Sequence, residues 1–91
     1  MAVHHATTNV GTTPVQLFAV PSGTLEFARV YITNHDNAAI FVGDATVATS
    51  GSNMGFTIVK DGNYDFEMRA NETIYAISAT SANVTVLAFG V

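Results

Sequence analysis

The chain has 91 residues, of which 48% are apolar and only 11% are charged, and its formal net charge is −4. The length fits one domain, and Arg29, Lys60 and Arg69 are too few and too scattered to neutralise the phosphates of a nucleic acid. Ordinary domains carry about 25% charged residues, so this chain has more apolar side chain than one small core hides. We therefore expect apolar surface to be buried against other copies or another protein.

The sequence contains no cysteine, so neither a disulfide nor a cysteine zinc site is available to stabilise the domain. No run approaches the roughly 20 apolar residues of a transmembrane helix. Residues 1–6 have neither the basic start nor the apolar stretch of a secretion signal. We therefore expect a protein that is made in a cytoplasm and has no membrane partner.

Residues 1–13 are polar and rich in threonine, and they predict an extended N-terminal arm ahead of a β-sandwich domain over residues 14–91. Val3 and Val10 are isolated apolar anchors in this arm. An extended segment cannot satisfy its own backbone donors, so we expect the arm to be poorly ordered alone and to order by adding to a neighbour's sheet edge. His4 and His5 point to opposite faces of such a strand and predict no metal site.

Residues 14–20 predict the first strand, because proline suits a strand's first position. A turn is expected at residues 21–23. Residues 24–33 predict a long strand and residues 38–44 a second apolar run, so the polar residues between them predict a hairpin.

The periodicity of the long strand is uneven. Tyr31 falls on the face of Leu25 and Phe27, whereas Val30 and Ile32 fall on the other face. Two explanations stay open. A β-bulge near residues 28–29 switches the faces, or both faces are covered, one of them by a partner.

The second half of the chain continues as short strands and turns. Residues 45–55 predict a loop of small polar residues, and Asp61-Gly62 predicts a hairpin turn after a short strand over residues 56–59. Residues 64–69 alternate between apolar and charged side chains. Residues 73–78 and 83–91 predict the last two strands. These elements predict an all-β fold, a small antiparallel β-sandwich or jelly-roll-like barrel of six to eight strands.

Both faces of the last two strands are apolar, although a sheet of a two-layer sandwich has one inner face. The bulkier sets, Leu87 with Phe89 and Tyr75 with Ile77, are expected to fill the core. That assignment leaves a smaller set for a subunit interface, namely Ile74, Val84 and Val86.

The residue types indicate no catalytic site, cofactor site or metal site. Asp36, Asp44 and Asp61 fall in expected turns, where aspartate bonds to its own backbone. His35 has no positioned nucleophile beside it, and no glycine-rich phosphate loop is present. We therefore expect that the chain is not an enzyme and takes no cofactor.

The chain also resembles a family of viral proteins across residues 14–89. The residues that carry the resemblance are Val15 and Leu17, Arg29-Val30-Tyr31-Ile32-Thr33-Asn34, Ile40-Phe41-Val42-Gly43-Asp44, Asn71-Glu72-Thr73-Ile74-Tyr75-Ala76-Ile77-Ser78 and Val84-Thr85-Val86-Leu87. This pattern resembles small β-sandwich structural proteins of tailed bacteriophages, which include capsid decoration or cement proteins and head-fibre or tail-tip modules.

The resemblance implies a virion component that is not an enzyme. A capsid decoration protein of this kind self-associates, often as a homotrimer, and binds the major capsid protein on the outer surface of the shell, which it stabilises. Val3 and Val10 would then belong to a capsid-docking arm. The chain departs from the best-known decoration proteins in lacking a long, proline-rich N-terminal arm.

The alternative is a receptor-binding or glycan-binding module of a phage head fibre or tail. Glycan recognition needs polar and aromatic groups together on exposed loops. The 45–55 loop is polar, and Phe56 is the one aromatic residue that adjoins it. The sequence therefore favours the decoration protein.

Overall fold

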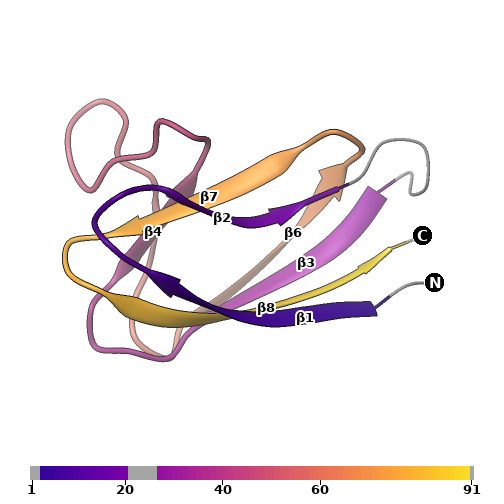
Figure 1. The fold of residues 1–91 in the computed structure, drawn as a ribbon, viewed down its shortest axis with the longest axis horizontal. Coiled ribbons are helices and arrows are strands. Elements are labelled where there is room, and N and C mark those ends of the chain that lie inside the picture. Colours follow the sequence, from indigo (N-terminus) through magenta and orange to yellow (C-terminus); the bar gives the residue numbers. More distant parts are fainter. Residues whose placement is uncertain (1–2, 21–26, 91) are drawn as a thin grey trace.

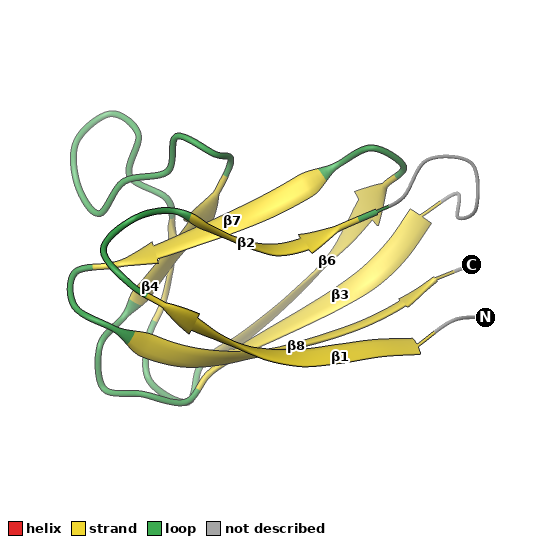
Figure 2. Ribbon diagram, viewed as in Figure 1, coloured by secondary structure: helices red, strands yellow, loops and turns green. Residues whose placement is uncertain are grey.

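The chain folds into two antiparallel β-sheets that pack face to face. The computed structural model describes residues 3–20 and 27–90. One sheet has the strand order β1-β8-β3-β6 and the other β2-β7-β4-β5 (Figure 1). The strands are β1 (Val3–Val10), β2 (Val15–Ala19), β3 (Phe27–Asn34), β4 (Ile40–Gly43), β5 (Phe56–Ile58), β6 (Asn63–Arg69), β7 (Thr73–Ser78) and β8 (Ala82–Gly90). Figure 2 shows strands and loops, without a helix, in the described residues, which confirms the predicted β-sandwich.

The order of strand pairing is that of a jelly roll. β1 pairs with β8, β2 with β7, β3 with β6 and β4 with β5, as the two arms of one long hairpin would pair. Two further pairs, β3 with β8 and β4 with β7, complete the two sheets. This rolled-up arrangement of eight antiparallel strands in two sheets is the jelly-roll form of the β-sandwich.

Both hairpins expected from the sequence are wrong, because those turns cross from one sheet to the other. β3 and β4 lie in different sheets, so residues 35–39 arch over the end of the sandwich. The Asp61-Gly62 turn likewise leads from β5 in one sheet to β6 in the other. Among consecutive strands of the described residues, β4 and β5 alone are paired neighbours. The turn residues marked where the strands end but not which strands pair.

The N-terminal segment is a strand of the sandwich. β1 pairs with β8 along its whole length, from Val3 opposite Phe89 to Val10 opposite Ala82. Val10 is fully buried in the core. The expected boundary between an arm over residues 1–13 and a separate sandwich is therefore wrong, because the chain's own β8 satisfies one side of the segment's backbone.

β3 runs in regular register with both of its neighbours, so its described part contains no β-bulge near residues 28–29. Val30 and Ile32 are fully buried, whereas Tyr31 points outward. The β-bulge explanation is therefore wrong for residues 27–34, and cover of the outer face by a partner stays a prediction. A register shift occurs instead in β2, between Gln16 and Phe18. The expected turn at residues 21–23 and the start of the expected long strand at 24–26 lie outside the described residues.

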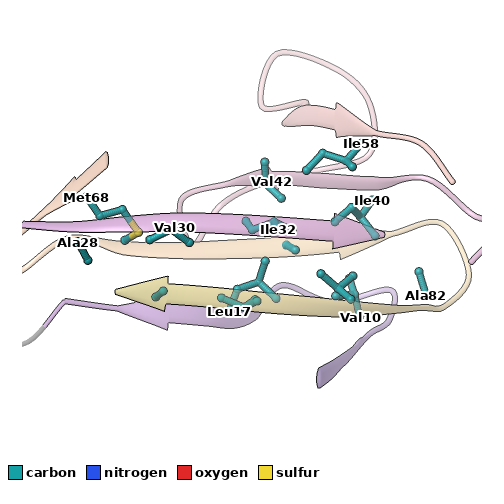
Figure 3. Close-up of a cluster of buried hydrophobic side chains, with 14 of the residues drawn as sticks. Val10, Leu17, Ala28, Val30, Ile32, Ile40, Val42, Ile58, Met68 and Ala82 are labelled. Carbon is teal, nitrogen blue, oxygen red and sulfur yellow. The ribbon is translucent and has the colours of Figure 1, made fainter. Parts of the chain in front are cut away.

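The core consists of aliphatic side chains that point into the space between the sheets, as Figure 3 shows. Its buried members are Val10, Leu17, Val20, Ala28, Val30, Ile32, Ile40, Val42, Ile58, Met68, Ala76, Ala82, Val84, Val86 and Ala88. Full burial of one large aliphatic side chain contributes roughly 1.5–3 kcal/mol. Valine and alanine make up most of this set, so the space between the sheets is filled by small side chains.

Asn34 is a fully buried polar residue at the point where two crossing connections meet. Its Nδ2 donates to the carbonyl oxygen of Ala38 at 2.9 Å and to that of Ile58 at 3.0 Å. Its backbone N–H donates to the Gly62 carbonyl at 3.1 Å, and its own carbonyl accepts from the Asp61 N–H at 2.8 Å. One residue therefore joins the β3–β4 connection to the β5–β6 connection.

Ser78 is a second buried polar residue, at the end of β7. Its Oγ donates to the Ala39 carbonyl at 3.1 Å, and its N–H donates to the Gly11 carbonyl at 2.8 Å. These bonds tie β7 to the β3–β4 and β1–β2 connections. No buried side-chain nitrogen or oxygen in the described part of the chain lacks a hydrogen-bond partner.

Replacing Asn34 with alanine should strongly destabilise the fold. The substitution leaves the carbonyls of Ala38 and Ile58 without the amide that bonds to them, and we expect the free energy of unfolding to fall by about 2–4 kcal/mol. Urea denaturation should show a lower midpoint at an unchanged slope. Asn37→Ala, at an exposed position in the same connection, is the matched control and should stay within about 0.5 kcal/mol of wild type. Equal midpoints for the two variants would contradict the role of Asn34.

Candidate interaction surfaces

β8 shows which side chains face inward and which face outward. Val84 and Val86 are fully buried, whereas Leu87 is 39% exposed and Phe89 is half-buried. The expectation that these valines form a subunit interface, with Leu87 and Phe89 in the core, is therefore wrong. Directly opposite residues of paired strands share a face, and Val86 lies opposite the buried Ile32. The register thus turns the valines inward.

β7 shows the same inversion. Ala76 is fully buried, and Ile74 packs against the core although it is partly exposed. Tyr75 and Ile77, which were expected in the core, lie on the outer face, where Ile77 is opposite Phe41 but is still only 9% exposed. Ile74 is therefore an inward-facing side chain and not part of an interface on the outer face.

The outer face of the β1-β8-β3-β6 sheet carries an apolar patch, which we define as Val3, Tyr31, Leu87 and Phe89. Val3 lies opposite Phe89, and Tyr31 lies opposite Leu87, so the four side chains sit on three adjacent strands. The Tyr31 ring stacks on the Phe89 ring with a centroid distance of 5.8 Å. Val3 is 67% exposed and Tyr31 37% exposed, so this patch faces solvent in the single chain.

Polar side chains border the apolar patch. On the β6 side, Arg29 Nη2 lies 2.6 Å from Asp65 Oδ2. Side-chain hydrogen bonding with Tyr31 is the largest cause that raises the pKa of Arg29, and hydrogen bonding with Asp65 is the next. The guanidinium therefore stays charged. Along the strands, the next outward row is formed by threonines, Thr7 opposite Thr85 and Thr85 opposite Thr33. The patch is therefore apolar at its centre and polar around it.

A second exposed cluster, which we call the aromatic ladder, consists of Phe56, Tyr64 and Phe66. The rings of Phe56 and Tyr64 are stacked at 4.4 Å between centroids, and those of Tyr64 and Phe66 at 5.6 Å. Phe56 is 54% exposed and Tyr64 39% exposed, while Phe66 packs against the core. Because β5 and β6 are edge strands of different sheets, the ladder spans the gap between the sheets at that side of the sandwich.

The loop between β4 and β5 lies beside this ladder and projects beyond the end of β4 (Figure 1, pink, upper left). The Ala48 N–H donates to the Asn53 carbonyl at 3.0 Å, and the Gly55 N–H donates to the Ala48 carbonyl at 3.1 Å. A Cβ at Gly55 would come within 2.6 Å of the Val42 carbonyl oxygen, so glycine lets the loop return close to β4. The loop is therefore folded back on the strand from which it leaves.

Asp44 begins this loop and is fixed within it. One carboxylate oxygen, Oδ1, accepts hydrogen bonds from the Thr46 hydroxyl at 2.6 Å and from the Thr46 N–H at 2.9 Å. The hydroxyl bond, followed by the backbone bond, lowers the pKa of Asp44 below its ordinary value. The side chain is therefore a carboxylate near neutral pH.

Two hollows adjoin Asp44. The first has a volume of about 260 Å³ and is lined by Val42, Gly43, Asp44, Thr46, Val47, Asn53, Met54, Gly55 and Phe56. The second has a volume of about 250 Å³ and is lined by Val42, Gly43, Asp44, Phe66, Glu67, Met68, Glu72, Thr73 and Ile74. The hollows share the end of β4, and each reaches one end of the aromatic ladder.

His35 and Asp36, which lie outside these surfaces, make structural contacts. His35 Nε2 lies 2.7 Å from Thr85 Oγ1, and Asp36 Oδ2 accepts from the Asn83 N–H at 2.6 Å, so both tie a crossing connection to β8. Among residues 3–20 and 27–90, no three His, Asp or Glu side chains are placed to hold a metal ion. The same residues include no helix of the length and apolarity needed to cross a membrane.

Val3 and Val10 were expected to act together in one docking arm, but the structure separates them. Val3 belongs to the apolar patch, and Val10 is in the core. Leu87 and Phe89 were missed because their bulk suggested burial, and for Tyr31 the sequence left open which face of its strand is inner. The signal that would have placed them is the run of valine and alanine at every second position of β8, which matches the small side chains of the core.

Comparison with known proteins gives a distant likeness. No family model and no curated protein matches the sequence. Among solved structures, a chain described by the words "Bacillus endospore appendages form a novel family of disulfide-linked pili" is similar, with a TM-score of 0.48 and 11% sequence identity. The likeness covers 99% of this chain and 88% of that chain. At this level it carries no argument about function.

Proposed function

We propose that this chain is a non-enzymatic structural protein that assembles with copies of itself through the apolar patch. The observation that supports the proposal is the grouping of Val3, Tyr31, Leu87 and Phe89 on one outer sheet face. Contiguous apolar surface rimmed by polar residues is typical of protein interaction sites. Identical chains commonly cover such a surface by symmetric association.

The character of this face supports a second copy as the partner. The outward side chains of β1 and β8 are Val3, His5, Thr7, Asn9, Asn83, Thr85, Leu87 and Phe89. This set contains no carboxylate, lysine or arginine, so two copies can approach without repulsion between like charges. The nearest cation, Arg29, is already paired with Asp65. Neither hollow described above is lined by a residue of the patch, so packing of one sheet face on another suits the surface.

We further propose that the assembled protein decorates the outer capsid surface of a tailed bacteriophage. The support is the resemblance to small β-sandwich structural proteins of tailed bacteriophages. By that resemblance, the assembly contains three copies. It binds the major capsid protein, and this binding stabilises the shell. The protein is then made in the host cytoplasm, and it uses no cofactor.

Leu87→Asp should weaken self-association without unfolding the chain. Leu87 is already 39% exposed, so an aspartate there remains solvated in the single chain. Loss of one apolar contact of roughly 1.5–3 kcal/mol corresponds to association that is at least about tenfold weaker. Sedimentation equilibrium at micromolar concentration should show wild-type oligomers and monomeric Leu87→Asp, with unchanged circular dichroism.

The matched control is Thr57→Asp, which places the same charge on an exposed position of the opposite sheet. This variant should associate like the wild type. The proposal fails if wild-type protein is monomeric throughout the micromolar range, or if Leu87→Asp retains the wild-type mass.

The virion role predicts a specific location and effect. Particles produced from the genome that encodes this chain should show it on the head exterior by electron microscopy. Particles that lack the chain should still assemble but release their DNA at a lower temperature, because fewer contacts bridge the capsid subunits. Added wild-type protein should restore the release temperature, and Leu87→Asp should not. Density for the chain on the tail alone, or its absence from the particles, would contradict the proposal.

A further inference from the structure

We propose that the aromatic ladder and the loop over residues 44–55 form a binding site for a neutral oligosaccharide. This site shares no residue with the apolar patch. Its parts are an exposed stack of rings, two adjoining hollows and a carboxylate between the hollows. The inference stands independently of self-association and of a capsid role.

The aromatic ladder supplies the apolar half of the site. Phe56 is more than half exposed, although it belongs to a strand of the core, and Tyr64 beside it is 39% exposed. Their stacked rings form one extended surface whose faces are apolar and whose tyrosine hydroxyl is polar. The C–H face of a pyranose ring packs on such a surface. The exposed part of this aromatic stack leaves apolar area in water, which a bound sugar would remove.

The first hollow supplies hydrogen-bonding groups beside Phe56. Asp44, Thr46 and Asn53 line this hollow together with Phe56. Asp44 uses Oδ1 for Thr46, and Oδ2 accepts no hydrogen bond within the described residues. A carboxylate oxygen accepts strongly from hydroxyl groups, and an asparagine amide both donates and accepts. The hydroxyls of a sugar require this combination.

The second hollow extends the site beyond one sugar unit. It is also lined by Asp44 and reaches Phe66, at the far end of the aromatic ladder. Glu67, Glu72 and Thr73 line its polar part. Because Val42, Gly43 and Asp44 line both hollows, the hollows are neighbours, and we infer that the ligand has at least two linked units.

The charge of the site selects a neutral ligand. Both hollows are lined without a lysine or arginine, so Asp44, Glu67 and Glu72 would repel an anionic sugar. Glu72 Oε1 accepts the Arg69 N–H, and Glu67 Oε1 lies 4.0 Å from Arg69 Nη2. Two of the three carboxylates therefore already face a donor or a cation, which disfavours a cationic ligand.

The site is also formed before the ligand arrives. Asp44 is fixed by Thr46, and the loop is closed on itself between Ala48 and Gly55. Ordering a loop costs free energy on binding, and a loop that is already ordered avoids this cost. The polar groups therefore stand next to the rings in the free chain.

The test begins with an array of neutral glucose-, galactose-, mannose- and N-acetylglucosamine-based oligosaccharides, with sialylated and sulfated glycans and choline as charged probes. We expect wild-type protein to bind members of the neutral set. Calorimetry with the best soluble oligosaccharide then gives a dissociation constant for a single site, free of the avidity that an oligomer shows on an array.

Phe56→Ala and Asp44→Asn should each weaken this binding at least tenfold. Asp44→Asn keeps an acceptor for Thr46 but loses the second carboxylate oxygen. Because Asp44 is exposed, this variant should stay folded even if Phe56→Ala does not. Thr57→Ala, on the opposite face of β5, is the matched control and should bind like the wild type. Leu87→Asp should also bind normally, which separates this test from that of self-association.

The proposal is overturned if no neutral oligosaccharide binds, or if only choline or the charged glycans bind. It is also overturned if folded Phe56→Ala and Asp44→Asn both keep the wild-type dissociation constant.

Discussion

The buried amide of Asn34 is the interaction on which the rest of the fold depends. In this jelly roll most consecutive strands lie in different sheets, so their connections receive no support from a hairpin ladder. Asn34 replaces that ladder with hydrogen bonds to the carbonyl of Ala38, in the β3–β4 connection, and to that of Ile58, at the end of β5. A buried amide without such partners would destabilise the fold. Asn34 therefore favours this arrangement of the connections over arrangements that would leave its amide unpaired.

The crossing connections also decide which side chains remain outside. They bring the sheets together over a core of valine, alanine and isoleucine, and this core is filled from the inward faces alone. The larger side chains of β3 and β8 then have no room between the two sheets. Tyr31, Leu87 and Phe89 gather on an outer face, and Phe56 and Tyr64 stack at an open side. Both candidate surfaces thus follow from how little volume the core encloses.

The sequence was sufficient for the strands and the fold class but not for strand partners or faces. A period of two shows that Val84 and Val86 share a face, yet it does not say which face is inner when both are apolar. Size was a misleading guide, because the bulkier Leu87 lies outside. The Asp61-Gly62 turn was placed correctly, but an Asp-Gly pair can occur either in a hairpin or in a connection that crosses between sheets. The Asn34 network, which decides between these, involves residues 24 positions apart.

The central claim is that the outer face with Leu87 is covered by another copy while the face with Val86 is core. Since the natural chain has no cysteine, labelling Leu87→Cys and Val86→Cys with a thiol reagent under native conditions tests this claim directly. Leu87→Cys should react rapidly in dilute protein and become protected as the concentration rises, and Val86→Cys should stay protected throughout. Rapid labelling of folded Val86→Cys, or labelling of Leu87→Cys that does not change with concentration, would contradict the claim.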